Sequence, residues 1–406
     1  MSEFSQNGII STLHDFKTRS TIEIENDLLK FSKERKMELI LPSLYSELEG
    51  TALPKIVEEI SKTKYLNHII IGLDKANEQQ AKKAWKFFKK LKTPFTILWN
   101  DGPRLKKLDK ELKKKDLAPS ELGKGRNVWY CIGMSIARDT ARSVALHDCD
   151  IKTYDRRMLA KLFYPVVNPL FNFEFCKGYY PRVANGKMNG RVARLLVFPL
   201  ITALEKTLGK SDYLDFMKSF KYPLAGEFSF RRNILPELRI SSDWGIEVGV
   251  LSEMQRNFSP QNICQVDLAD SYDHKHQDLS IDDQTKGLSR MSIDIIKTFI
   301  KKLATQGNSF SRETFRSLKA TYYRSALDLI DIYRNDAEMN GLKFDSHTEE
   351  KTVELFAANI MKAGEAFYLN PMDTPFIPTW SRVKSAIPDF LIRLKEAVNE
   401  DNKKYS

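Results

Sequence analysis

The sequence is poor in cysteine and has no long apolar run, and these absences exclude several classes of protein. Its 406 residues include four cysteines, and no two of them stand in a CxxC spacing. Such a distribution argues against a disulfide framework and a zinc ribbon, and it favours a reducing, cytoplasmic location. No segment reaches the ~20 apolar residues of a membrane-spanning helix. Residues 1–7 have no basic start before an apolar run, so we expect no signal peptide.

Positive charge is what the chain has in excess. It carries 64 Lys and Arg against 53 Asp and Glu, a formal net charge of +11. The lysines gather at residues 83–92 and 106–115, interleaved with Leu, Phe and Trp, which is typical of the exposed face of amphipathic helices. No RNA-binding motif accompanies the charge. We therefore expect no nucleic-acid or membrane partner, and we look for anionic metabolites instead.

Short apolar strands alternate with amphipathic helices through the first 150 residues. Strands are predicted at residues 37–42, 68–73, 95–99 and 143–146. Helices are predicted at residues 53–60, at 78–90 and after Gly125. This order predicts the α/β class, with a parallel sheet and helices on both of its faces. Ligands of such sheets bind beyond the carboxyl ends of the strands.

Three parts follow one another along the chain. We expect an N-terminal arm at residues 1–30, a catalytic domain at 31–280 and an all-helical C-terminal extension at 281–406. Within this domain, residues 31–150 and 151–280 are expected to form two halves. Helical periodicity in the extension covers residues 291–303, 312–334, 348–363 and 382–398.

Two acidic residues, Asp148 and Asp150, follow the strand predicted at residues 143–146. In extended backbone, residues two apart point to the same side, so both carboxylates can face one Mg²⁺ or Mn²⁺. An acidic pair at a strand end is more often a cap for the next helix, so the motif is weak alone. His274 and His276 are also two residues apart and could share one site.

Two further motifs suit phosphate or carboxylate groups. At residues 123–125 the sequence GKG combines glycines, which let backbone approach a phosphate, with the charge of Lys124. It is not a Walker A loop. Arg191 opens an apolar helix predicted over residues 192–204, where its guanidinium and the free helix N–H groups would make an anion site.

The ordered set of motifs resembles the glucosyl-3-phosphoglycerate synthases, which are retaining GT-A glycosyltransferases. The likeness covers residues 37–277, and motif order is more specific than any single motif. It rests on LPSLYSE (41–47), GKGRNVW (123–129), DCD (148–150), GRV (190–192), PLAGE (223–227), WGIEVG (244–249), QVDL (265–268) and DHKH (273–276). The resemblance implies a GT-A-like fold and transfer of glucose from UDP- or GDP-glucose to 3-phosphoglycerate. It also implies that residues 31–150 bind the sugar donor and residues 151–280 bind the acceptor. The product would be glucosyl-3-phosphoglycerate, a precursor of the compatible solute glucosylglycerate, and the cofactor Mg²⁺ or Mn²⁺.

The same resemblance implies roles for individual residues. The sugar donor would meet Pro42, Ser43, Leu44, Lys124 and Asp148. The metal would be held by Asp148, Asp150 and His274. The acceptor would meet Gly190, Arg191 and His276. Catalysis would depend most on Asp150, Glu247 and Arg191, with Glu247 orienting the transferred hexose and front-face attack giving retention. Glu227 and Glu247 are the carboxylates to test as nucleophiles.

Other functions stay open at this point. Mannosyl transfer to a glycerate-type acceptor would use the same fold, and a sugar nucleotidyltransferase would share the sheet and the acidic metal site. A non-catalytic basic RNA-binding protein belongs to another class, and salt-sensitive RNA binding would identify it. The base of the donor, the choice of glucose or mannose and the formation of a homodimer also stay open.

Overall fold

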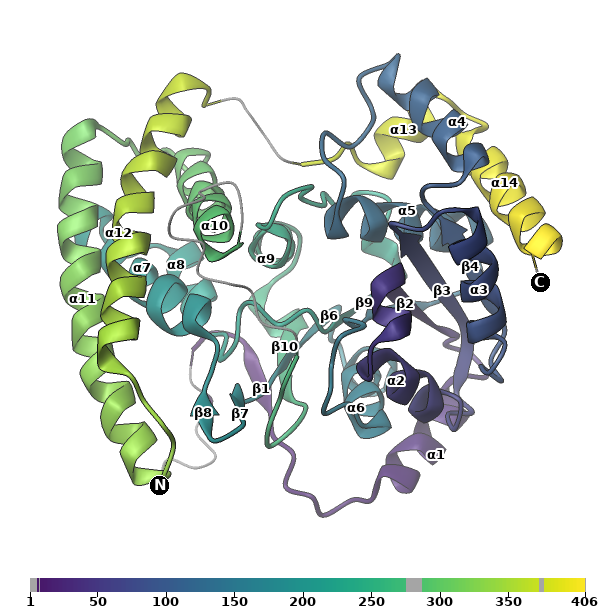
Figure 1. The fold of residues 1–406 in the computed structure, drawn as a ribbon, viewed down its shortest axis with the longest axis horizontal. Coiled ribbons are helices and arrows are strands. Elements are labelled where there is room, and N and C mark those ends of the chain that lie inside the picture. The colour runs from purple at the N-terminus through teal and green to yellow at the C-terminus, as the bar shows by residue number, and fades with distance from the viewer. Residues whose placement is uncertain (1–5, 7, 275–286, 372–375, 406) are drawn as a thin grey trace.

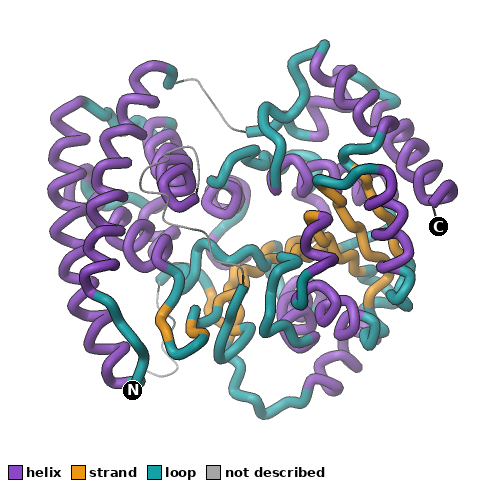
Figure 2. The backbone as a smooth tube through the Cα atoms, in the orientation of Figure 1, coloured by secondary structure: helices purple, strands orange, loops and turns teal. Residues whose placement is uncertain are grey.

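An eight-stranded sheet runs through the middle of the protein and is enclosed by helices (Figure 1, Figure 2). The computed structural model describes residues 6, 8–274, 287–371 and 376–405. In spatial order the strands are β1 (Ser11–Leu13), β10 (Ile263–Asp267), β6 (Phe175–Tyr179), β9 (Phe228–Arg231), β5 (Ser143–Leu146), β2 (Met37–Leu44), β3 (Leu66–Asp74) and β4 (Phe95–Trp99). A separate hairpin pairs β7 (Val183–Ala184) with β8 (Lys187–Met188).

Most neighbouring strands are parallel, as the alternation of strands and helices predicts. Strand β9 is the exception, because it lies antiparallel to both β5 and β6. The central strands are buried on both faces. On β3, for example, Ile70 belongs to one apolar cluster and its neighbours Ile69 and Ile71 belong to the other.

The helices of the first two thirds pack on the sheet or connect its strands. They are α1 (Thr21–Phe31), α2 (Ala52–Ile60), α3 (Glu78–Phe88), α4 (Pro103–Lys113), α5 (Lys124–Arg138), α6 (Arg156–Val167), α7 (Phe198–Leu208), α8 (Asp212–Lys218) and α9 (Ile246–Asn257). A π-helical turn (Val192–Val197) leads into α7, and 3₁₀ turns cover Tyr45–Glu49, Arg232–Ile234 and Pro260–Asn262.

The N-terminal residues are joined to the sheet. Strand β1 pairs in parallel with β10, Ile10 is buried, and α1 packs against α6. Residues 8–31 thus extend the sheet at one edge and pack on α6.

The C-terminal helices divide between two places (Figure 1). Helices α10 (Gly287–Ala304), α11 (Arg312–Met339) and α12 (Ser346–Leu369) pack on α7, α9 and the π-helical turn. Helices α13 (Trp380–Ala386) and α14 (Phe390–Tyr405) lie against α4, α5 and β4. None of the helices in the described ranges is both long and apolar enough to cross a membrane.

The single last helix predicted at residues 382–398 is wrong. The chain forms α13 and α14 instead, with Pro388 in the break. Ile387 adopts φ −142° and ψ 86°, because a residue before proline is pushed out of the helical region.

Candidate active site

The carboxyl ends of β2 and β5 leave the sheet at the same edge. Their pairing ends at Ile40 and Leu146, and the chain continues into residues 42–44 and 147–150. The edge therefore gathers the residues predicted for the sugar donor, as expected for a parallel sheet. Ser43 is buried, and its hydroxyl donates to the carbonyl oxygen of Leu44 at 3.1 Å.

Lys124 connects two predicted site residues that are far apart in the sequence. Its Nζ lies 2.6 Å from Oδ1 of Asp148 and 3.0 Å from Oε1 of Glu247. Lys124 opens α5 and Glu247 lies in the first turn of α9, so the starts of two helices meet at the loop after β5. Burial opposes the charge on Lys124, but the two carboxylates outweigh burial and raise the pKa of Lys124. Burial raises the pKa of Asp148, and Lys124 counters that effect.

Gly226 of the PLAGE motif lies directly against Asp148. A Cβ atom on Gly226 would come within 2.1 Å of Oδ2 of Asp148. Only glycine leaves room for the carboxylate in this position, so Gly226 is needed for Asp148 to adopt its observed position.

Asp150 faces His274, with 3.5 Å between Oδ2 of Asp150 and Nδ1 of His274. The loop that carries His274 is held by Asp273, whose carbonyl oxygen accepts from the backbone N–H of Lys152 at 2.9 Å. Burial raises the pKa of Asp150, but His274 and Lys124 outweigh burial, and the pKa falls below its ordinary value. The structure thus brings together two of the three predicted metal ligands.

A divalent cation fits the chemistry of this group, because carboxylate oxygens are the ligands that Mg²⁺ and Mn²⁺ prefer, and imidazole is a common ligand of transition metals. Asp150 and His274 have the required proximity, whereas Asp148 is paired with Lys124. Among the described residues, no three His, Cys, Asp or Glu side chains form a cluster that could hold a metal. The three-residue metal site therefore stays a prediction.

Glu227 lies in the interior beneath two stacked tyrosines. Its carboxylate oxygens accept from the hydroxyls of Tyr180 and Tyr272 at 2.7 and 2.8 Å, and the two rings stack 3.6 Å apart. Glu227 has no exposed surface, and burial raises its pKa. A carboxylate held in this way is a poor candidate for the nucleophile, so Glu247 is the more accessible of the two.

Arg191, predicted to bind the acceptor, lies immediately before the π-helical turn and pairs with the C-terminal extension. Its Nε lies 2.9 Å from Oε1 of Glu349 in α12. Gly190 precedes it with φ +75°, in the left-handed region that glycine favours. Motif reasoning did not select Glu349, because no local signal links it to a residue 158 positions away. The remaining predicted acceptor residue, His276, lies outside the described residues.

Two more cations line the same region. Arg182 lies against Gly190, donates to the hydroxyl of Tyr222 at 2.9 Å and stacks on the ring of Tyr272. Lys177 is fully buried and donates to the carbonyl oxygen of Ala225 at 2.6 Å. Burial lowers the pKa of Lys177 to about 8.

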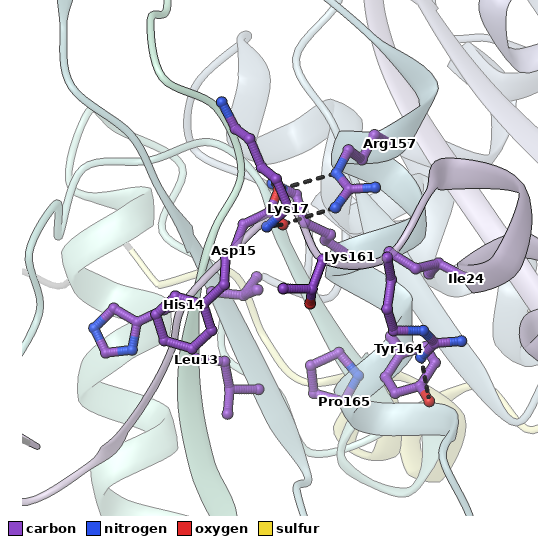
Figure 3. Close-up of a pocket in the computed structure, with 13 residues that line it drawn as sticks. Leu13, His14, Asp15, Lys17, Ile24, Arg157, Lys161, Tyr164 and Pro165 are labelled. Carbon is purple, nitrogen blue, oxygen red and sulfur yellow. Dashed lines mark hydrogen bonds and ion pairs between the residues drawn. The ribbon is translucent and has the colours of Figure 1, made fainter. Parts of the chain in front are cut away.

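A separate cavity lies beside the N-terminal arm (Figure 3). In it, Arg157 and Lys161 of α6 both bind the carboxylate of Asp15, at 2.7 and 2.8 Å. None of the predicted site residues lines this cavity. Asp15 thus forms ion pairs with both cations, which fits a role in holding the N-terminal arm against α6.

Comparison with known proteins decides the family. No family model matches the chain. The glucosyl-3-phosphoglycerate synthase of Persephonella marina is 44% identical over 402 residues, 99% of each chain. The enzyme of the same name from Methanococcoides burtonii is 39% identical and covers 98% of this chain and 97% of its own. This chain belongs to the glucosyl-3-phosphoglycerate synthase family.

Solved structures confirm the predicted GT-A-like fold. Glucosyl-3-phosphoglycerate synthase from Mycobacterium tuberculosis matches with a TM-score of 0.52 at 20% identity, over 72% of this chain and 88% of its own. Mannosyl-3-phosphoglycerate synthase from Rubrobacter xylanophilus matches with a TM-score of 0.54 at 18% identity, over 74% and 83%. Family membership also confirms the prediction of a glycosyltransferase.

Proposed function

We propose that this protein transfers glucose from UDP-glucose to 3-phosphoglycerate, with retention and with the help of Mg²⁺ or Mn²⁺. The observation that carries the proposal is the contact of Lys124 with Asp148 and Glu247 at the carboxyl edge of the sheet. It occurs in a chain that is 44% identical to a glucosyl-3-phosphoglycerate synthase over 99% of its length. The product would be glucosyl-3-phosphoglycerate, a precursor of glucosylglycerate.

Each charged residue then has a distinct task. Lys124 keeps a fixed positive charge beside Asp148, where the diphosphate of the sugar donor would lie, and Glu247 would accept hydrogen bonds from the hexose hydroxyls. Asp150 and His274, joined by Asp148, would hold the cation. A bound cation would offset the charge of the diphosphate leaving group.

The acceptor side and the stereochemistry follow from the remaining contacts. Arg191 would bind the anionic groups of the acceptor with the part of its guanidinium that Glu349 leaves open. Glu227 is sealed by tyrosines, and Glu247 is paired with Lys124. We therefore favour front-face attack, in which an oxygen of the leaving diphosphate takes the proton of the acceptor hydroxyl.

The choice of UDP-glucose over GDP-glucose is the finer part of the proposal. The Mycobacterium tuberculosis synthase has been solved in complex with Mn²⁺, UDP-glucose and phosphoglyceric acid. We also propose a cytoplasmic location, because all four cysteines are buried free thiols. The absence of nucleic-acid and membrane partners, and a homodimer, stay predictions.

A matrix of sugar donors and acceptors tests the proposal. UDP-glucose, GDP-glucose and GDP-mannose are each mixed with 3-phosphoglycerate or glycerate and Mn²⁺, and products are identified by mass spectrometry. We expect glucosyl-3-phosphoglycerate from UDP-glucose, and no turnover in excess chelator. Asp150→Asn should lower kcat by about 100-fold or more, because a metal-held leaving group is hard to replace. The exposed Asp328→Asn on α11 is the control and should keep full activity.

Other outcomes of the matrix would replace the proposal. Efficient use of glycerate would remove the phosphate-binding role of Arg191. Mannosyl transfer would show that the donor sugar is mannose, and full turnover in excess chelator would show that the reaction needs no metal ion. Release of pyrophosphate from a nucleoside triphosphate and a sugar phosphate would instead indicate a nucleotidyltransferase.

A further inference from the structure

We propose that Glu349 is a positioning residue for the acceptor, so that helix α12 of the C-terminal extension is a working part of the acceptor site. The inference rests on the proposed function, in which Arg191 binds the anionic groups of the acceptor. It assigns a role to a part of the chain that the motif likeness at residues 37–277 does not reach.

Glu349 holds Arg191 by one edge of its guanidinium. Oε1 of Glu349 accepts from Nε of Arg191 at 2.9 Å, and within the described residues this is the single hydrogen bond of the Arg191 side chain. A guanidinium has five N–H donors, so the four on its outer nitrogens are left for a ligand. Arg191 is 35% exposed, whereas the Glu349 side chain is 5% exposed. The contact thus holds Arg191 through Nε and leaves its two Nη groups available on the solvent side.

The second oxygen of Glu349 fixes the loop before Arg191. Oε2 lies 2.9 Å from Nη1 of Arg194, in a buried ion pair that lacks hydrogen-bond geometry. Arg194 in turn donates from Nε to the carbonyl oxygen of Asn189 at 2.9 Å and from Nη2 to that of Met188 at 3.3 Å. These carbonyls belong to the segment that enters Gly190, so one buried carboxylate positions both the anion-binding side chain and the backbone beside it.

The rest of the extension docks on the same segment. Before α12, the backbone N–H of Lys343 donates to the carbonyl oxygen of Gly186 at 2.8 Å, in the turn of the β7–β8 hairpin. The Arg194 guanidinium lies 4.9 Å from the ring centre of Tyr333 in α11. Tyr322 of α11 donates to the carbonyl oxygen of Leu195 in the π-helical turn. Such turns are frequent at functional sites, and here helix packing from the extension supports one.

Two possible roles of Glu349, neutralising charge and orienting Arg191, predict opposite effects on acceptor binding when its carboxylate is lost. Glu349 neutralises one of its two arginines, so its removal adds positive charge near the acceptor, which by Coulomb attraction would tighten anion binding. If its work is to orient Arg191, its removal frees the long side chain, and binding must then order it again. If Glu349 orients Arg191, Glu349→Gln should bind the acceptor more weakly. If Glu349 only competes with the acceptor for the charge of Arg191, the same variant should bind the acceptor more tightly.

Steady-state kinetics with 3-phosphoglycerate and UDP-glucose separate these cases. We expect Glu349→Gln to raise the KM for 3-phosphoglycerate about tenfold or more, the effect of one hydrogen bond to a charged group, with the KM for UDP-glucose little changed. Glu354→Gln, which breaks an exposed pair with Lys351 on the same helix, is the matched control and should change neither constant. In an Arg191→Lys background, Glu349→Gln should add little. A lower or unchanged acceptor KM would overturn the inference.

Hydrogen exchange provides a readout that does not depend on turnover. Amides of residues 186–197 should exchange faster in Glu349→Gln than in the wild type, and Glu354→Gln should match the wild type. If the wild type makes no product from 3-phosphoglycerate, the proposed function fails, and the exchange experiment still decides whether Glu349 organises this loop. Unchanged exchange in Glu349→Gln would then overturn the inference as well.

Discussion

At the scale of single residues, the site depends on close contacts between groups that the sequence keeps far apart. Asp148 is held on one side by the charge of Lys124 and on the other by the bare backbone of Gly226. A carboxylate confined in this way cannot shift without losing one of its neighbours. Its position is therefore set before any substrate binds, which is what an electrostatic site requires.

Gly226→Ala tests this confinement. The new methyl group would lie 2.1 Å from Oδ2 of Asp148, so the carboxylate must move. We expect kcat/KM to fall about 100-fold, since displacements of about an ångström have such effects, while circular dichroism shows a folded protein. Gly50→Ala is the matched control, because its Cβ would meet its nearest neighbour at 3.4 Å, an ordinary contact. Equal activity of the two variants would show that Asp148 has room to relax.

The site could be predicted from the sequence where motifs carry it. Separate motifs predict Lys124, Asp148 and Glu247, and the structure places Nζ of Lys124 within 3.0 Å of both carboxylates. Glu349 could not be selected, because it stands in a predicted helix beside other acidic residues, and nothing local shows which of them is buried. The partner of Arg191 is determined by how the extension packs, which is tertiary information.

At the scale of elements, α13 is fastened to α5 by two tryptophans. The rings of Trp129 and Trp380 stack 3.9 Å apart, and Trp380 Nε1 donates to the carbonyl oxygen of Trp129 at 3.0 Å. Trp129 Nε1 donates to the carbonyl oxygen of Pro378 at 2.9 Å. Both indole N–H groups are thus satisfied in the interior, as buried tryptophans require.

Trp380→Ala should destabilise the protein markedly. The side chain is 1% exposed, so its truncation leaves a large cavity and removes the hydrogen bond to the carbonyl oxygen of Trp129. We expect the free energy of unfolding in urea to fall by about 3–5 kcal/mol, and Trp380→Phe to lose less, because the ring packing is partly kept. Tyr323→Ala, at an exposed position of α11, is the control. A loss below about 1 kcal/mol for Trp380→Ala would mean that α13 is not part of the cooperative unit.

The elements were predicted best where local periodicity decides them. The strands at residues 95–99 and 143–146 have the predicted bounds, since each is a short apolar run between polar flanks. Strand β9 was missed, because FSFR is brief and its antiparallel place between β5 and β6 follows from chain topology. The break at Pro388 is predictable in principle, because a proline disfavours the helical conformation of the residue before it.

At the scale of the whole molecule, buried histidines link stability to pH. His68 on β3 is 6% exposed and bonded to Thr96 at 2.8 Å. Burial, with a smaller effect of Arg138, lowers the pKa of His68 to about 3. In the unfolded chain the pKa is about 6.5, so between these values the unfolded state binds more protons. The contribution of His68 to the free energy of unfolding is therefore fully present above the pKa of the unfolded state, and it is lost as pH falls from about 6.5 toward 3.

His68→Gln should weaken this dependence. From pH 7 to pH 5, the wild type should lose about 2 kcal/mol through His68 alone, and the variant should lose less by that amount. Urea unfolding at both pH values measures the difference. His347→Gln, at an exposed position of α12, should keep the wild-type dependence. An identical fall in stability for wild type and His68→Gln would show that His68 is not held neutral in the folded protein.

The two groups of C-terminal helices also determine when the fold can be completed. In α14, the side chain of Asn402 donates to the carbonyl oxygen of Ile97 on β4 and accepts from its backbone N–H, at 2.9 and 3.0 Å. It occupies hydrogen-bonding groups of an edge strand that could otherwise pair with another chain. Because Asn402 lies 305 residues after Ile97 in the chain, this edge stays open while the intervening residues are synthesised. A nascent chain would thus carry an unprotected strand until α14 has been made, and slow translation would lengthen the exposure to aggregation.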